Sequence, residues 1–233
     1  SMFSKLFSCG STSPSQKVKL WWDPLSGPAR AVRIALMKLD LDPEIVRVTI
    51  GKEPRTKEFK AEVNPLGVIP VIEHEGEKIY ESANIIRYLF NTFKKRDSVY
   101  PTKCTKARAK VDFWLDWTNN TGRPAFTFAF FRIVAGPKFF GMKEQTEDQK
   151  AELMEKVNSA MDFLDSQLEN LTYLSGENLT MADVQVYMEV FQSQYFLQFE
   201  LSKHPNLEKW FENVTEDKDI QDLKAQFEER LKE

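Results

Sequence analysis

Two short stretches decide the fold of this protein, residues 64–70 (NPLGVIP) and residues 81–89 (ESANIIRYL). Between them, apolar residues flank the pair Glu75-Gly76, which is typical of a tight turn, so a β-hairpin is expected there. The second stretch has a serine, a common helix N-cap, at its second position and then spaces its apolar residues as one face of a helix does. Together they predict a loop, a hairpin and a helix in succession.

Toward the N-terminus, the same reading gives two strands and two helices. Residues 17–23 (KVKLWWD) form a short apolar run that ends at Pro24, which indicates a strand, and Pro28 suits the first turn of a following helix. Residues 44–50 (EIVRVTI) alternate as a strand does, and residues 57–63 have a helical pattern. The order β-α-β-α-β-β-α is therefore predicted within about 80 residues, a small α/β unit of typical domain size.

Toward the C-terminus, the chain is expected to be entirely helical. Residues 94–102 are charged and end in a Tyr-Pro pair, which favours a linker. Apolar residues recur at three- and four-residue spacing in the segments beyond it, near residues 103–121, 125–141, 147–169, 180–197 and 205–230. The fold class predicted is α+β with two domains, residues 17–93 and 103–233, after a disordered tail or tag remnant at residues 1–16.

Composition excludes several classes of protein. The 233 residues include 32 Lys and Arg against 35 Asp and Glu, so the net charge is −3 and no basic field favours nucleic acid. Two cysteines and two histidines are too few for a disulfide framework or a structural zinc site, and no metal site is predicted. No apolar run is long enough to span a membrane, and the expected location is the cytoplasm. Cys9 is expected to be incidental to the tail, with palmitoylation as the alternative.

A third motif, residues 176–183 (GENLTMAD), joins the first two. With all three in this order, the sequence resembles a cytosolic glutathione S-transferase of the theta-like, serine type. The resemblance covers nearly the whole chain from Lys17 onward. It implies a thioredoxin-like N-terminal domain, an all-helical C-terminal domain and a homodimer. It also implies glutathione as co-substrate with no other cofactor, and small electrophiles as second substrates.

The resemblance implies where glutathione binds. Val68, Ile69 and Pro70 would meet its cysteinyl part, with the Ile69–Pro70 bond in the cis form instead of the trans form that an ordinary loop would have. Ser82 would take the γ-glutamyl carboxylate at a helix start, whose dipole favours an anion, and Ser82 can serve as an N-cap at the same time. Glu81 would face the γ-glutamyl ammonium.

Two more residues are assigned to glutathione by the same pattern. Asp112 is expected to reach the ammonium, from the partner subunit of the dimer. Arg55 is expected to hold the glycyl carboxylate, with Lys52 or Lys57 as alternatives. Relatives often place a lysine in the loop where this chain has Gly67 and Val68, so this end of the site departs from the family pattern.

The catalytic position implied is Ser26, in the segment LSGPAR. No tyrosine or cysteine is available in this strand-to-helix turn, and the pattern looks like the theta pattern L-S-x-P-x-R. A hydroxyl donor beside a helix N-terminus would stabilise the glutathione thiolate, whereas a simple helix cap is the alternative.

The electrophile site is expected along Leu25, the helix that contains Asp112, and the chain end. Helical spacing brings Asp116, Asn119 and Arg123 to the face of Asp112. Four phenylalanines are read as core, with a pocket lining as the alternative: Phe126, Phe128, Phe130 and Phe131. The segment 180–183 is read as a helix cap that serves folding, and His74 and His204 are given no chemical role.

Two other readings of function remain open. A binding or regulatory module could keep the scaffold and the affinity for glutathione without turnover, because fold does not fix function. A glutathione-dependent peroxidase or isomerase would use the same thiolate on a different electrophile.

Overall fold

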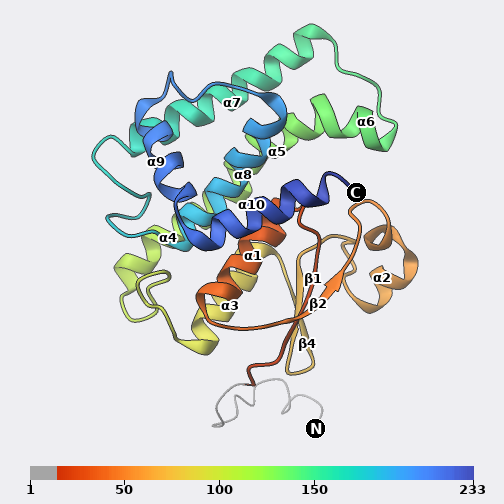
Figure 1. The fold of residues 1–233 in the computed structure, drawn as a ribbon, viewed down its shortest axis with the longest axis vertical. Coiled ribbons are helices and arrows are strands. Elements are labelled where there is room, and N and C mark those ends of the chain that lie inside the picture. Colours follow the sequence, from red (N-terminus) through yellow and green to blue (C-terminus); the bar gives the residue numbers. More distant parts are fainter. Residues whose placement is uncertain (1–14) are drawn as a thin grey trace.

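The computed structural model describes residues 15–233, and Figure 1 shows their arrangement. A four-stranded sheet has the order β2-β1-β3-β4. β1 is parallel to β2, and the other neighbours are antiparallel. The strands are β1 (Val18–Trp22), β2 (Glu44–Arg47), β3 (Val71–His74) and β4 (Glu77–Tyr80).

The register of the sheet places the ends of β1, β2 and β4 and the start of β3 at one edge. Trp21 of β1 pairs with Val71 of β3, and Val71 pairs with Tyr80 of β4. Trp22 pairs with Arg47 at the end of β2. The segments after β1, β2 and β4 and the segment before β3 therefore all leave the sheet at the same edge.

Helices cover both faces of the sheet. The first half contains α1 (Gly27–Lys38), the short turn η2 (Glu53–Arg55), α2 (Lys57–Glu62) and α3 (Ser82–Phe93). Leu20 joins the main core with α1 and α3, whereas its neighbour Trp21 packs with Phe59 of α2 in a separate cluster. Successive residues of a strand point to opposite faces, so α2 covers the face opposite to α1 and α3.

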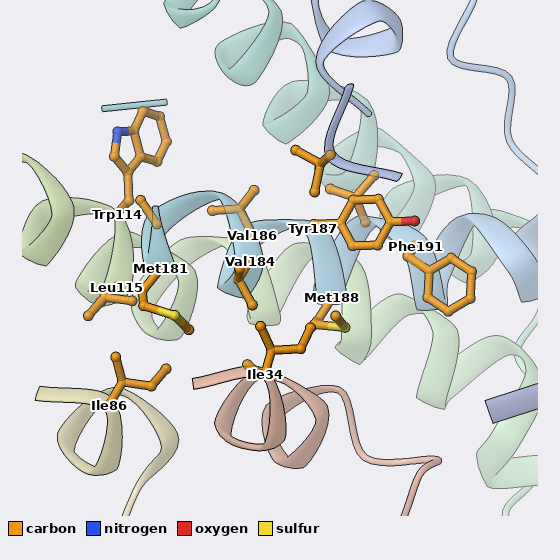
Figure 2. Packing of buried hydrophobic residues seen from close by; sticks show 14 of the residues in the cluster. Ile34, Ile86, Trp114, Leu115, Met181, Val184, Val186, Tyr187, Met188 and Phe191 are labelled. Carbon is orange, nitrogen blue, oxygen red and sulfur yellow. The ribbon is translucent and has the colours of Figure 1, made fainter. Parts of the chain in front are cut away.

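The second half is helical. Its elements are α4 (Thr105–Trp117), η3 (Thr118–Gly122), α5 (Arg123–Phe130), η4 (Phe131–Ala135), α6 (Gly136–Phe140), α7 (Glu147–Gln167), α8 (Met181–Leu197), α9 (Pro205–Thr215) and α10 (Lys218–Arg230). Every residue of α8 from Met181 to Ser193 is buried. Figure 2 shows α8 lying across Ile34 of α1 and Ile86 of α3, so this helix joins the two halves of the molecule.

These observations confirm the predicted fold class, a sheet-containing N-terminal half with a helical C-terminal half. The hairpin is confirmed as well, and both residues of its turn, Glu75 and Gly76, have positive φ. α3 ends at Phe93 and α4 begins at Thr105, on either side of the segment predicted as a linker. The proposed tail lies mostly outside the described residues, Cys9 included. The Ser15 carbonyl accepts a hydrogen bond from His74 Nε2 at 2.7 Å. Within residues 15–233, no helix is both long and apolar enough to cross a membrane.

The predicted break near Gly122 and Pro124 is wrong, because the chain stays helical through both. Wider π-helical turns, η3 and η4, connect α4, α5 and α6 instead. A Cβ at Gly122 would lie 2.8 Å from the Trp117 ring, so the absence of a side chain lets the helix pass close to that indole. Pro124 sits in the first turn of α5, where a missing N–H is tolerated.

The predicted helix over residues 205–230 is in fact two helices, α9 and α10. Asp217 interrupts it, because its side chain accepts hydrogen bonds from the backbone N–H groups of Asp219 and Ile220 and so starts a new helix. The ammonium of Lys38 on α1 lies 2.7 Å from the same carboxylate. The new start thereby ties α10 to the N-terminal half.

The first turn of α8 carries a buried carboxylate that organises its surroundings. Asp183 accepts hydrogen bonds from Thr180 N at 2.8 Å, Leu174 N at 2.7 Å and Trp210 Nε1 at 2.9 Å. Burial raises the pKa of Asp183, and these donors oppose that shift. The segment 180–183 therefore has the structural role expected for it.

Replacing Asp183 should destabilise the protein strongly. Asp183→Ala strands four buried donors, the Thr180 hydroxyl among them, and is expected to lower the free energy of unfolding by about 3 kcal/mol or more. Asp148→Ala, in the exposed first turn of α7, is the matched control and should cost only about 0.3–1 kcal/mol. Urea unfolding of both variants measures the difference, and equal losses would contradict this role for Asp183.

Candidate active site

The edge of the sheet where β1, β2 and β4 end brings together residues that are distant in sequence. Ser26 follows β1, Ile69 and Pro70 precede β3, and Ser82 follows β4. The Ile69–Pro70 peptide bond is cis, as predicted. Two helices of 12 residues, α1 and α3, begin at this edge, and their N-terminal N–H groups favour anions there.

Ser26 is the N-cap of α1 and is 8% exposed. Its Oγ accepts a hydrogen bond from Ala29 N at 3.3 Å, and its own backbone N–H donates to Asp23 O at 2.9 Å. Because Oγ is the acceptor in this bond, its hydroxyl hydrogen stays available to a ligand. Capping and hydrogen-bond donation are therefore compatible at Ser26.

A cavity of about 680 Å³ opens beside Ser26, between the two halves of the chain. The N-terminal half contributes the turn that carries Leu25 and Ser26 and the segment that carries Lys52 and Arg55. Aromatic side chains from α5, η4, α6, α8 and α10 form much of the opposite wall. They are Phe130, Phe131, Phe139, Phe140, Phe196 and Phe227. The cavity is apolar on one side and holds two cations and a hydroxyl on the other.

A buried carboxylate holds together the segments that carry the N-terminal side of this cavity. Asp23 is fully buried, and its two oxygens accept hydrogen bonds from Leu25 N at 3.0 Å and Ile50 N at 3.1 Å. The Arg230 guanidinium of α10 forms an ion pair with it, at 3.4 Å between Nε and Oδ1. Asp23 thus holds the Ser26 turn, the segment after β2 and the last helix to one another.

A buried guanidinium also binds the backbone of the Ser26 turn. Arg30 is fully buried on α1, and it donates to Pro24 O and, at 2.9 Å, to Gln192 Oε1 of α8. Its guanidinium also lies over the Phe227 ring of α10, 4.7 Å from the centroid. Burial lowers the pKa of Arg30 to about 10, against the opposing field of Glu189, so the group stays charged at neutral pH.

The loop before the cis proline has a defined shape. Asn64 is buried, donates to Val68 O at 2.8 Å and accepts from Leu66 N at 3.0 Å. Gly67 has φ +68°, and a Cβ there would lie 2.8 Å from Pro54 O. This close approach fixes the loop against the turn that ends in Arg55, and it explains why the chain has glycine there.

At the start of α3, Glu81 occupies the N-cap position and Ser82 is the first helical residue. The expected N-cap role of Ser82 is therefore wrong by one residue. Glu81 has φ +66°, a left-handed conformation that turns the chain into the helix one residue early, and Ile85 N donates to Glu81 O at 2.8 Å. No side chain caps this helix, so its first N–H groups are left for a ligand or water.

Comparisons with known proteins agree with this arrangement. Residues 22–97 match the family model described as "Glutathione S-transferase, N-terminal domain", and residues 123–218 match "Glutathione S-transferase, C-terminal domain". Glutathione S-transferase D7 of Drosophila melanogaster is 32% identical over 192 residues, which is 82% of this chain and 81% of that protein. This chain belongs to the glutathione S-transferase family.

Other members of the glutathione S-transferase family are similar as well. Human glutathione S-transferase theta-1 is 31% identical over 173 residues, 74% of this chain and 72% of that protein. The solved structure of human glutathione-S-transferase T1-1 in its apo form has a TM-score of 0.82 at 27% identity, covering 91% of this chain and 88% of that one. The resemblance predicted from the sequence is thus confirmed.

The predicted residues of this glutathione S-transferase fall into three groups, of which two lie at the cavity or at the sheet edge beside it. Ser26, Leu25 and Arg55 line the cavity, together with Lys52. Val68, Ile69, Pro70, Glu81 and Ser82 lie at the same edge of the sheet without being among its lining residues.

The residues predicted on α4 and just beyond it lie away from the cavity lining. Arg87 of α3 binds Asp112 at 2.8 Å and Asp116 at 2.7 Å, and Tyr100 also donates to Asp112, at 2.9 Å. Arg123 pairs with the buried Glu189 of α8 at 2.9 Å. None of the four predicted residues lines the cavity, so they do not form the polar wall expected there: Asp112, Asp116, Asn119 and Arg123.

The four phenylalanines read as core divide between three environments. Phe126 is fully buried and packs against Phe199, which is a core position. Phe130 and Phe131 line the cavity, and Phe128 is half exposed. Phe130 also stacks on Phe196, at 4.5 Å between centroids, so the same ring serves both packing and cavity.

Sequence reasoning missed the supporting residues of the site. The sequence patterns assign no role to Asp23 or Gln192, and they include Arg30 only as the last residue of the segment LSGPAR. Charged residues in an apolar helical pattern are a usable signal, because such groups are buried only when paired. The lining residues on α6 have no local signal, since they depend on tertiary packing, whereas the chain end expected beside the site contributes Phe227 and Leu231 to the lining.

Removing the Asp23 carboxylate should destabilise the fold more than removing a surface acid. Asp23→Ala leaves two backbone donors without an acceptor and Arg230 with Glu233 as its remaining carboxylate partner, so the free energy of unfolding is expected to fall by about 3 kcal/mol. Glu152→Ala breaks an exposed pair with Lys156 on α7 and should cost about 0–1 kcal/mol. Denaturant unfolding of both variants tests this, and a small loss for Asp23→Ala would show that the turn is held by other groups.

Proposed function

We propose that this protein is a glutathione transferase in which the Ser26 hydroxyl stabilises the thiolate of bound glutathione, with no other cofactor. The observation that carries the proposal is the position of Ser26. Its hydroxyl stands at the N-terminus of α1, on the wall of an apolar cavity, at the same sheet edge as Pro70 and Ser82.

Glutathione has an extended peptide backbone with charged ends, and the sheet edge offers complementary groups to each part. The uncapped start of α3 and the Ser82 hydroxyl suit the γ-glutamyl carboxylate, and the exposed Glu81 suits the ammonium. The backbone of Ile69 before the cis proline is suited to pair with the cysteinyl residue. Arg55, with Lys52 beside the cavity, suits the glycyl carboxylate.

The chemistry required of Ser26 is modest. A free thiol has a pKa of about 8.5, so most of it is protonated at neutral pH. A hydrogen bond donated by Ser26 and the positive end of the α1 dipole both stabilise the thiolate and lower that pKa. The thiol proton is released to solvent, and Ser26 itself forms no covalent bond.

The cavity beside Ser26 supports an apolar electrophile as the second substrate. Its phenylalanine rings would hold such a molecule next to the sulfur and exclude water from the reaction. The thiolate sulfur then forms a bond to the electrophilic carbon, and the leaving group departs with its electron pair. Assembly as a homodimer and a cytoplasmic location stay predictions from the family resemblance.

Replacing Ser26 should impair thiolate formation while leaving affinity for glutathione largely intact. Ser26→Ala is expected to raise the pKa of the bound thiol toward the free value and to lower the rate by about 10²–10³ if the site is dry, less if water replaces the hydroxyl. Ultraviolet difference spectra of the bound thiolate across pH give the pKa, and turnover with an aryl halide gives the rate.

The matched control for this experiment is Ser193→Ala, a buried serine of α8 whose hydroxyl has no hydrogen-bond partner among the described residues. It should leave both the pKa and the rate unchanged. Wild-type values for Ser26→Ala would reduce Ser26 to a helix cap. Glutathione binding without turnover in the unmodified protein would favour a binding module.

Replacing Ser82 should weaken glutathione binding. Ser82→Ala removes the hydroxyl assigned to a charged carboxylate and should cost about 1–3 kcal/mol of binding free energy. Calorimetric titration measures it, with Ser166→Ala as control, since that exposed hydroxyl bonds only within α7 to Phe163 O. An unchanged affinity would place the γ-glutamyl group elsewhere.

A further inference from the structure

One face of α8 contacts residues near the N-termini of both α1 and α3. Gln185, Met188 and Gln192 are spaced three and four residues apart, so they share one face of α8. Gln192 and Met188 contact Arg30, the Met188 sulfur lying 3.4 Å from Arg30 Nε. Gln185 contacts Ser82, at the start of α3. The C-terminal half therefore reaches both α1 and α3 through one helix face, as the course of α8 in Figure 2 shows.

The buried side-chain amide of Gln185 has a hydrogen-bond partner for its nitrogen but none, among the described residues, for its oxygen. The residue is 1% exposed, and its Nε2 donates to Ser82 Oγ at 3.3 Å. Its Oε1 is buried and has no hydrogen-bond partner in the described part of the chain. A buried amide oxygen without a donor destabilises a protein, and an apolar side chain of similar length would avoid that cost. Packing alone therefore does not explain a glutamine at this position.

We propose that Gln185 is a positioning residue for glutathione, which acts through Ser82. A serine oxygen has two lone pairs and one hydrogen. When Gln185 Nε2 donates to one lone pair, the hydroxyl hydrogen is directed away from the amide and is free to donate to the γ-glutamyl carboxylate. Gln185 thereby sets Ser82 as a donor before the ligand arrives.

The inference rests on the proposed function, because it assigns the γ-glutamyl carboxylate to Ser82. It adds that the C-terminal half of the chain takes part in binding glutathione through a residue that does not touch the ligand. Ser26 is on a different helix, so the thiolate chemistry should be independent of Gln185.

The test is a double-mutant cycle read by calorimetric titration with two ligands. The ligands are glutathione and its analogue in which hydrogen replaces the α-carboxylate of the γ-glutamyl residue. Gln185→Met should weaken glutathione binding about 3- to 10-fold, the effect of one lost hydrogen bond. It should leave affinity for the analogue unchanged, and it should have no further effect in the Ser82→Ala background.

Two further readouts separate positioning from a structural role. In Gln185→Met the KM for glutathione should rise, while kcat at saturating glutathione and the pKa of the bound thiol should stay at wild-type values. The free energy of unfolding should not fall, because the unpartnered oxygen is gone. Gln185→Asn, whose amide is one methylene shorter, should also weaken glutathione binding and serves if the methionine variant does not fold.

The matched control is Gln194→Met, on the same helix but lining a separate surface pocket next to Tyr195. It should leave both affinities unchanged. Equal losses for glutathione and the analogue, or an undiminished loss in the Ser82→Ala background, would overturn the proposal. Tighter binding in Gln185→Met would overturn it too, since Gln185 would then be accepting the Ser82 hydrogen.

The failure of this inference differs from the failure of the proposed function. If Ser82→Ala weakens glutathione binding and both Gln185 variants do not, only the role of Gln185 is lost. If Ser82→Ala itself leaves glutathione binding unchanged, the assignment of the carboxylate to Ser82 is wrong, and the role of Gln185 is wrong with it.

Discussion

The rest of the site depends on the contacts that the buried Arg30 guanidinium makes with α8, α10 and the Ser26 turn. Removing a charge from water is costly, and the cost is met only where the group is fully hydrogen-bonded or placed over aromatic rings. Arg30 meets this cost through hydrogen bonds to Pro24 O and Gln192 and through its position over the Phe227 ring. These partners belong to the Ser26 turn, to α8 and to α10. One side chain therefore fixes the Ser26 turn relative to the helices that supply the far wall of the cavity.

The sheet register supplies the second constraint. Because β1 and β4 end, and β3 begins, at one edge, the starts of α1 and α3 lie on the same side of the sheet. The two starts differ in one respect that matters for ligands. Ser26 caps α1, whereas no side chain caps α3. We assign the thiolate to the first, which offers a hydroxyl, and the carboxylate to the second, which offers free N–H groups.

The fold and the sheet edge could be predicted from sequence because their signals are local. Alternation and turn pairs each act over a few residues, and the β-hairpin followed from them, whereas the cis Ile69–Pro70 bond was expected only from the family resemblance. Helical spacing also predicted that Asp112 and Asp116 share a face, and Arg87 binds both. The direction of that face was not predictable, since it depends on how α4 packs on α3. Helical periodicity predicts which residues share a face, but it does not predict which element packs against that face.

The same limit applies to the buried polar groups. Asp23 binds Ile50, Gln185 binds Ser82 and Gln192 binds Arg30, across 27, 103 and 162 residues of chain. Local spacing does not reveal such distant partners, and every residue of α8 from Met181 to Ser193 is buried, so hydropathy does not separate a buried face from an exposed one there. Helical periodicity alone merges α9 and α10, whereas the capping side chain of Asp217 is a local signal for the start of a new helix.

The central claim is that one edge of the sheet binds glutathione with its sulfur beside Ser26. The most direct test is a crystal structure of the protein with glutathione bound. The account predicts the sulfur within hydrogen-bond distance of Ser26 Oγ, the cysteinyl backbone paired with Ile69, and the γ-glutamyl carboxylate at the start of α3 against Ser82. Glutathione bound with its sulfur away from Ser26, or with its carboxylate away from α3, would contradict it.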